Sequence, residues 1–517
     1  AYEIRLSLVG SEMCIRDRRG RVMGDESTVL TAADARHLLR RTGFGAPVKD
    51  VARILNRGET RGAAADRLLG FKPAAFQPAG KDLRLRQNSW LKYMIGAKNP
   101  LQEKLVLFWH DHFATAASKV GSVTLMAAQN RLLRKLCKGS FRTLLQSINR
   151  DPAMLEFLDT VRNRKRTPNE NYGRELCELF ALGVKDSSGN ATYLQEDVVQ
   201  IARAFTGWRI SKDKADFDEG QHDFEEDYPE RGPKVIFTQV GGFGPGGRSF
   251  ASAGEGAIES DTVIDILLAH RDSDARSTVA RRVARRLLEF FAHGAFGEST
   301  PETTAVVDAV IDASGFDGTW DVTALLRAIL VSDAFYETAA TAPFGASTAK
   351  SVKWPVDFVV TTLRTVGLKA KGREYYVDGG SRRSLRSHLQ AMGQQLFEPP
   401  SVFGWEWEKS WITSATVLAR ARFARDVIAA RGNGGTSFRP EKLVDLGLTA
   451  PDEILDATLD ALGFADQVTA AQRTVLLDYL TDAGARPSLD LENDDTRDRK
   501  LHGLFGLLLQ SPTFQLH

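Results

Sequence analysis

The sequence predicts an all-α protein: a multi-helix domain of orthogonal or bundle-like packing that carries one long irregular insertion. Two observations predict this class. Apolar residues recur at helical spacing in one segment after another, and many of these segments begin at capping residues or end at glycines. The chain shows no run of regularly spaced strands and no internal repeat of 20–50 residues.

The helices are predicted in order by their start signals and their spacing. Thr31 caps an amphipathic run that ends at Gly43, and Asn99-Pro100 begins a run over 101–113. Asp151-Pro152 begins a short helix, and Thr167-Pro168 is a cap and first-turn pair for a helix over 168–182. The other segments with helical spacing are 123–148, 195–206, 261–269, 275–292, 302–313, 321–337, 354–366 and 415–430.

Two segments break the helical pattern. Residues 211–257 are polar and then rich in glycine, which predicts a long insertion with one short hairpin. Residues 431–440, RGNGGTSFRP, predict a linker. We therefore expect a leader at 1–22, a helical domain at 23–430 with its insertion at 211–257, and a linker with a small helical appendix at 431–517.

The overall composition is that of a globular protein. The 517 residues include 68 Lys and Arg, 66 Asp and Glu and three cysteines, and 43% are hydrophobic. These values exclude a disordered chain, a disulfide scaffold and a general nucleic-acid coat, so we expect no nucleic-acid partner. No stretch approaches 18 uninterrupted apolar residues, so we expect no membrane span.

Residues 1–22 resemble translated sequencing-adapter readthrough. They lack the apolar core of a signal peptide, and arginines interrupt them throughout. We expect them to be disordered and dispensable, with Met23 as the natural start. Cys137 and Cys177 lie in apolar helical patterns, which together with the missing export signal predicts a cytoplasmic location. An export signal lost with a damaged start is the open alternative.

Five groups of motifs resemble the bacterial family known as domain of unknown function 1800. They are KLVLFWHDHFATAASKV, DPAMLEFLDTVRNRKRTPNENYGRELCELFALGV, YLQEDVVQIARAFTGW, VIDILLAH with ARRVARRLLEFF, and GQQLFEPPSVFGWEWEKSWI. The likeness spans most of residues 31–430 and implies a largely helical fold without an assigned activity. Members often lie beside domain of unknown function 1501, a family similar to sulfatases, which implies such a protein as a partner. The stretch 217–234 departs from the family pattern, which Gly220–Asp223 and Lys234 match only loosely.

The densest polar cluster lies within 168–180. At about 100° per residue, one helix face holds Asn171, Arg174, Glu175 and Glu178. One interpretation is an exposed surface with i,i+4 ion pairs. The other is a catalytic site in which the glutamates are general acid and base and the other two residues anchor the substrate. The site requires this face to turn inward, toward His110 and His112, because buried carboxylates need partners.

Histidines and a nearby acid form a second candidate site. His110 and His112 lie about 200° apart on a regular helix and converge on a metal only where that helix ends. With Glu175, Glu178, His222 and Asp223 as further donors, they would suit a divalent transition metal such as zinc, manganese or iron. The alternative is one histidine packed under the helix and one favoured by the dipole at its C-terminus.

A third candidate site follows the extended Pro399-Pro400 segment. Trp405, Trp407 and Trp411 could form a stacking platform for a sugar or another flat ligand. The alternative is loop aromatics that fill a gap between helical layers. The basic stripe of Arg281, Arg282, Arg285 and Arg286 favours a solvated or ion-paired face over a nucleic-acid site.

Three functional hypotheses follow from these clusters. The leading one is a metal-assisted hydrolase that uses the histidines and glutamates. The second is a non-catalytic partner or chaperone of the sulfatase-like neighbour. The third is carbohydrate binding through the tryptophans. The substrate and the oligomeric state do not follow from the sequence.

Overall fold

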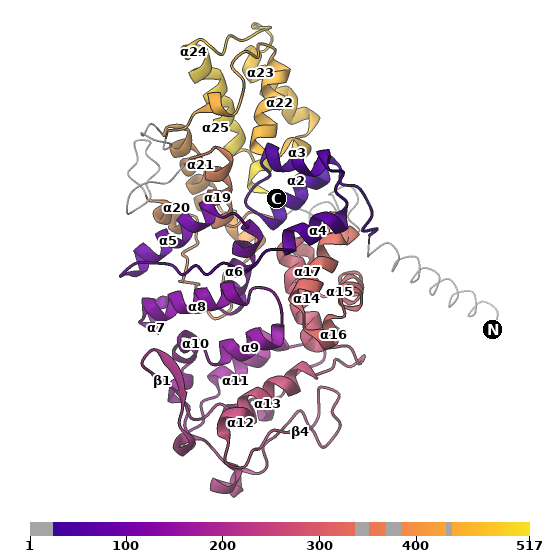
Figure 1. The fold of residues 1–517 in the computed structure, drawn as a ribbon, viewed down its shortest axis with the longest axis vertical. Helices are drawn as coiled ribbons and strands as arrows, with labels where there is room; N and C mark the ends of the chain where they lie inside the picture. Colours follow the sequence, from indigo (N-terminus) through magenta and orange to yellow (C-terminus); the bar gives the residue numbers. More distant parts are fainter. Residues whose placement is uncertain (1–23, 337–350, 369–383, 431–436) are drawn as a thin grey trace, which may run out of the picture.

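The computed structural model describes residues 24–336, 351–368, 384–430 and 437–517 (Figure 1). The predictions for the leader at 1–22 and for most of the linker therefore lie outside the described residues. Helices dominate the described parts of the chain, so the predicted all-α fold is confirmed.

The α-helices, in chain order, are α2 (Ala32–Thr42), α3 (Val48–Asn56), α4 (Arg61–Leu69), α5 (Leu83–Gly96), α6 (Pro100–His112), α7 (Ala117–Val120), α8 (Val123–Lys135), α9 (Phe141–Asn149), α10 (Pro152–Phe157), α11 (Asn171–Glu175), α12 (Gln195–Ala204), α13 (Gly256–Leu268), α14 (Thr278–Phe291), α15 (Pro301–Ser314), α16 (Phe316–Thr319), α17 (Val322–Val331), α18 (Asp333–Tyr336), α19 (Pro355–Thr365), α20 (Leu385–Ala391), α21 (Ser414–Ile428), α22 (Pro451–Leu462), α23 (Ala470–Thr481), α24 (Asp494–Thr496) and α25 (Gly503–Gln510). Two segments are π-helical, namely η2 (Leu176–Ala181) and η10 (Arg497–His502). The 3₁₀ turns are η1 (Thr160–Arg162), η3 (Glu219–Gln221), η4 (Glu225–Asp227), η5 (Pro229–Arg231), η6 (Gly294–Gly297), η7 (Glu408–Trp411), η8 (Pro440–Lys442), η9 (Ala465–Gln467) and η11 (Thr513–Gln515).

Local capping explains several helix starts. The Thr31 side chain accepts a hydrogen bond from the backbone of Asp34, and the Asp151 side chain accepts one from Met154. Proline occupies the first turn of α6 and α10, as predicted. The predicted helix start at Pro168 is wrong, because α11 begins at Asn171. Side-chain hydrogen bonds of asparagines to the backbone instead hold the preceding residues in a turn.

The prediction of one short hairpin within 211–257 is wrong, because the described residues form two small antiparallel β-sheets here and the first begins at Trp208. β1 (Trp208–Ser211) pairs with β2 (Lys214–Phe217), with Trp208 opposite Phe217. β3 (Val235–Ile236) pairs with β4 (Arg248–Ser249). These strands lie at the end of the molecule opposite α22–α25 (Figure 1).

Segments far apart in the sequence meet along the molecule. The C-terminal helices lie beside α2 (Figure 1), where Arg36 of α2 pairs with Asp460 of α22 at 2.6 Å. α6 runs through the interior, and every residue from Leu101 to His112 is buried. This burial places the charged and polar residues of α6 inside the protein, where each of them needs a partner.

Candidate functional site

An open groove of about 660 Å³ lies between the 400–411 loop and α14. Its volume is typical of a small-molecule site. We call it the aromatic groove, because its lining includes Phe403, Trp405, Trp407 and Trp411 together with Arg286 and Glu289 of α14. The three tryptophans predicted as ligand-binding residues therefore line one groove.

The aromatic residues contribute unequally to the groove surface. Trp405 and Trp411 are each only 4% exposed and pack against Trp354 in the core. Trp407 is half-buried. The side chain of Phe403, by contrast, is 63% exposed. Each interpretation of this loop therefore fits some of its residues. Trp405 and Trp411 fill a gap between helices, and the Phe403 ring is free to contact a ligand.

Asp111, at the end of α6, anchors the groove from beneath. Its Oδ1 accepts the backbone N–H of Trp405 at 2.8 Å, and its Oδ2 accepts the indole N–H of Trp407 at 2.9 Å. Arg286 Nη2 lies 3.3 Å from the same Oδ2. The carboxyl group is almost fully buried, so it positions the loop without reaching the groove surface.

Arg286 joins α14 to the aromatic loop. Its guanidinium carbon lies 3.9 Å from the centre of the Trp407 ring. Its Nη1 donates to Glu289 Oε2 at 2.8 Å. Stacking and two carboxylate contacts fix this planar side chain in one orientation. The polar part of the groove is therefore preorganised.

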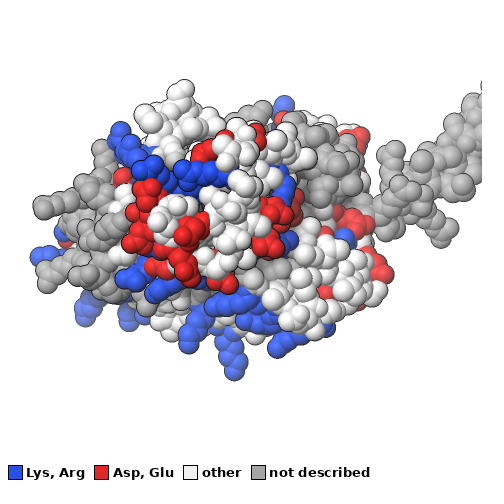
Figure 2. Space-filling model, turned by 90° about the horizontal axis from the view of Figure 1, so that it is seen from above, with Lys and Arg blue, Asp and Glu red and all other residues white. Residues whose placement is uncertain are grey.

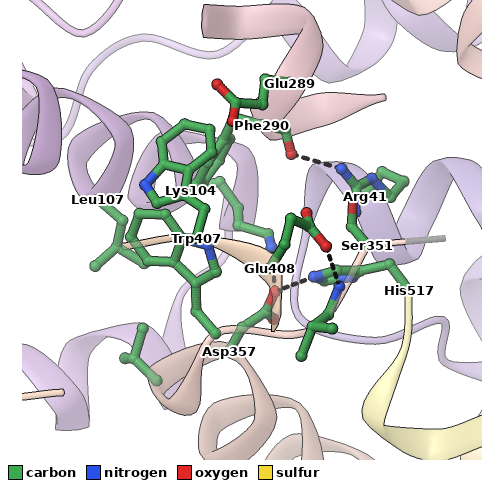
Figure 3. Close-up of a pocket in the computed structure, with 13 residues that line it drawn as sticks. Arg41, Lys104, Leu107, Glu289, Phe290, Ser351, Asp357, Trp407, Glu408 and His517 are labelled. Carbon is green, nitrogen blue, oxygen red and sulfur yellow. Dashed lines mark hydrogen bonds and ion pairs between the residues drawn. The ribbon is translucent and has the colours of Figure 1, made fainter. Parts of the chain in front are cut away.

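A small cavity of about 20 Å³ adjoins the groove and shares Trp407 and Glu289 with it. Figure 3 shows Glu408 in the middle of this cavity, with Trp407 on one side and Arg41 and His517 on the other. The space suffices for about one water molecule. We interpret the cavity as part of the wall that supports the loop.

Three ionisable residues of this cavity, Lys104, Asp357 and His517, form one cluster. His517 Nε2 lies 2.7 Å from Asp357 Oδ2, and Lys104 forms an ion pair with the same oxygen. Although burial raises the pKa of Asp357, Lys104 and His517 hold it below its usual range. Glu408 Oε2 accepts the backbone N–H of Val352 at 2.9 Å.

The predicted catalytic face on α11 and η2 is half-exposed rather than turned inward. Its residues are Asn171, Arg174, Glu175 and Glu178. Arg174 Nη2 donates to Glu170 Oε2 at 2.9 Å, which is the predicted i,i+4 surface pair. Burial and the neighbouring Glu178 raise the pKa of Glu175. This arrangement favours the ion-paired surface interpretation.

His110 and His112 have separate partners at the end of α6. His110 Nε2 accepts the backbone N–H of Phe397 at 3.2 Å, and burial lowers the pKa of this imidazole to about 3. His112 Nε2 donates to the carbonyl of Phe180 at 3.1 Å. Because the two residues are two positions apart on a regular helix, they point in different directions. They do not converge.

His222 and Asp223 are themselves buried and belong to a separate polar network. His222 Nε2 lies 3.1 Å from Glu259 Oε2 and 3.3 Å from Lys234 Nζ. Asp223 forms ion pairs with Arg203 and Arg231. In the described parts of the chain, no group of three or more His, Cys, Asp or Glu side chains could hold a metal ion. The predicted metal site at His110, His112, His222 and Asp223 thus finds no support, because each side chain already has a local partner.

Sequence reasoning missed the part that Arg286 and Glu289 take in lining the aromatic groove and the part of Asp111 in anchoring it from beneath. Asp111 lies between His110 and His112 in the sequence. A carboxylate at the end of a strongly apolar helix is expected to be buried, and a buried carboxylate needs hydrogen-bond partners. This pattern could have indicated the role of Asp111. Arg286 and Glu289 are three residues apart on α14, a spacing that places them side by side.

Asp111 should make stability depend on pH. Burial raises its pKa from 3.8 to about 7, although Arg286 and the N–H donors of Trp405 and Trp407 oppose the shift. The folded state therefore binds a proton more tightly than the unfolded state, and stability falls as the pH rises from about 4 to 7. Relative to an Asp111→Asn variant, the wild type should lose about 1.4 kcal/mol per pH unit in this window.

This difference can be measured by urea denaturation of both proteins at pH 5, 6 and 7. Histidines that titrate in the same range are present in both proteins, so their contributions cancel. A constant difference between the two proteins across this window would contradict the raised pKa of Asp111.

Two further observations agree with the composition. At the end formed by α22–α25, Lys and Arg lie among Asp and Glu (Figure 2), as the nearly balanced net charge suggests. Within the described residues, every helix is too short or too polar to cross a lipid bilayer.

Comparison with known proteins identifies one family. A family model described as "Protein of unknown function (DUF1800)" matches residues 37–516. No curated protein and no solved structure gives a significant match.

Proposed function

The chain belongs to the family of proteins of unknown function DUF1800, and we propose that it binds a saccharide in the aromatic groove. The observation that carries the proposal is the Phe403 ring. It is 63% exposed, and it borders a groove that also presents Arg286 and Glu289. An accessible apolar ring beside fixed hydrogen-bonding groups suits a sugar, which offers apolar C–H faces and hydroxyl edges.

The other hypotheses have weaker support. The metal-assisted hydrolase lacks a convergent ligand set among the described residues. Glu175 and Glu178 remain candidate acid and base groups, but they lie on a different element from the groove. The role as a partner of a sulfatase-like protein and the cytoplasmic location stay predictions.

Saccharide binding can be measured by isothermal titration calorimetry with neutral hexasaccharides such as cellohexaose, xylohexaose and N-acetylchitohexaose. We expect saturable binding of at least one of them. A Phe403→Ala substitution should weaken this binding about tenfold, because it removes the stacking surface. It should leave stability almost unchanged, because the ring is mostly exposed in the folded state.

Val475 provides a matched control. Its side chain is 67% exposed, like that of Phe403, but it belongs to α23 and does not line the groove. A Val475→Ala variant should bind the saccharide as the wild type does. Equal affinity in the Phe403→Ala variant and the wild type would refute the proposed site.

A further inference from the structure

Four arginines project from α14, and three of them have full sets of partners. Arg281 contacts the carboxylates of Asp272, Asp274 and Asp308 at 2.7–2.8 Å. Arg285 donates to the carbonyl of Glu298 at 2.6 Å and to the hydroxyls of Thr303 and Thr304 in the first turn of α15. Arg286 is held by Asp111 and Glu289. Arg281 and Arg286 are therefore ion-paired, and Arg285 is satisfied by neutral acceptors.

Arg282 differs from these three. Its Nη2 donates to the carbonyl of Leu179 at the long distance of 3.4 Å, and its buried Nε has no hydrogen-bond partner among the described residues. No carboxylate in the described part of the chain lies within ion-pair distance of its guanidinium. A guanidinium offers five N–H donors. Arg282 is half-buried, so this cation is partly removed from water without a carboxylate in direct contact.

The surroundings of Arg282 compensate its charge only in part: burial and Arg286 lower the pKa of the guanidinium to about 10, and Glu289 and Glu178 oppose this shift without forming an ion pair. Gly183 lies beside it, where an added Cβ would be 3.7 Å from Arg282 Nη1. His112 remains neutral, since burial and then Arg282 and Arg286 lower its pKa well below the usual value. Glu178 Oε2 accepts a hydrogen bond from the Tyr193 hydroxyl at 3.2 Å. Glu178 is thus engaged by another residue.

We propose that Arg282 binds an oxyanion of the ligand, so that the saccharide of the aromatic groove is an acidic one. This inference rests on the proposed function. Arg282 precedes Arg286 by four residues, so it lies on the same face of α14, about 6 Å further along the helix axis. An oligosaccharide that extends from the groove along α14 meets this guanidinium. Its planar fork matches the oxygens of a carboxylate or a sulfate group.

Calorimetry with three oligosaccharides of equal length tests the proposal on the full chain. The probes are a neutral galacto-oligosaccharide, an oligogalacturonate and a sulfated galacto-oligosaccharide. We expect at least one acidic probe to bind the wild type about tenfold or more tightly than the neutral probe. The comparison of the two acidic probes shows whether Arg282 prefers the carboxylate of the oligogalacturonate or the sulfate group of the sulfated oligosaccharide. High salt should reduce this preference.

Two variants test whether the tighter binding of the acidic probe depends on Arg282. Arg282→Gln should abolish it and leave the affinity for the neutral probe unchanged. Arg285→Gln, the matched control on the same helix, should keep it, because Arg285 contacts Glu298 and the start of α15 instead. A preference that survives in Arg282→Gln, or a wild type that binds only the neutral probe, overturns the proposal.

A second measurement separates this inference from the proposed function. Sodium sulfate is compared with sodium chloride at equal ionic strength, and the melting temperature is recorded. We expect sulfate to raise the melting temperature of the wild type more than that of Arg282→Gln. If no saccharide binds but this difference is present, the saccharide function fails and the anion site stands. Equal sulfate effects in the two proteins overturn the anion site.

Discussion

Replacing Arg134 with leucine should lower the free energy of unfolding by about 3–5 kcal/mol. Arg134 Nε and Nη2 donate to the two oxygens of Glu103 at 2.7 and 2.8 Å. Both side chains are completely buried. The indole N–H of Trp90 donates to the same carboxylate at 2.8 Å. Without the guanidinium, Glu103 is left as a buried charge with only one neutral donor, which is why the expected loss is large.

Urea denaturation monitored by circular dichroism measures this loss. Arg473→Leu is the control, since Arg473 pairs with Asp456 at the surface, where both side chains are about one third or more exposed. We expect the control to lose about 1 kcal/mol or less. Adding Glu103→Leu to the Arg134→Leu variant should recover part of the loss, because the unpaired charge disappears. Equal losses in the buried and surface variants would contradict this account.

A Gly404→Ala substitution should destabilise the protein by about 3–5 kcal/mol, through backbone strain and steric overlap. Gly404 has a φ of +82°, which favours glycine. A Cβ at this position would also lie 2.4 Å from Asp111 Oδ1 and 2.8 Å from the Asp111 carbonyl oxygen. The loop must then move away from its anchor. We therefore expect saccharide affinity to fall as well.

Gly393 is the matched control for this substitution. It also lines the aromatic groove and has a φ of +91°, but an added Cβ would meet only Trp411, at 3.7 Å. Gly393→Ala should therefore show the backbone strain alone, about 1–2 kcal/mol. The unfolding free energies of the two variants can be compared in the same denaturant series. A loss for Gly404→Ala no larger than that for Gly393→Ala would mean that the loop does not depend on its contact with Asp111.

The sequence was sufficient to predict the fold class and many helix boundaries. Helix starts at Asn99-Pro100 and Asp151-Pro152 depend on residues within one turn, so local chemistry decides them. The start predicted at Pro168 failed because Asn163 and Asn169 hold a turn there through their side chains. That competing set of hydrogen bonds was not visible in the capping pattern.

The sequence also predicted the face shared by Asn171, Arg174, Glu175 and Glu178, and the tryptophans that line the groove. Both follow from short-range spacing. Tertiary structure decided which of these clusters meet. Asp111 contacts Arg286 and Trp405, which lie 175 and 294 residues away in the chain. Helical periodicity specifies which face of a helix is apolar, but the partner of a buried polar group depends on how distant segments pack together.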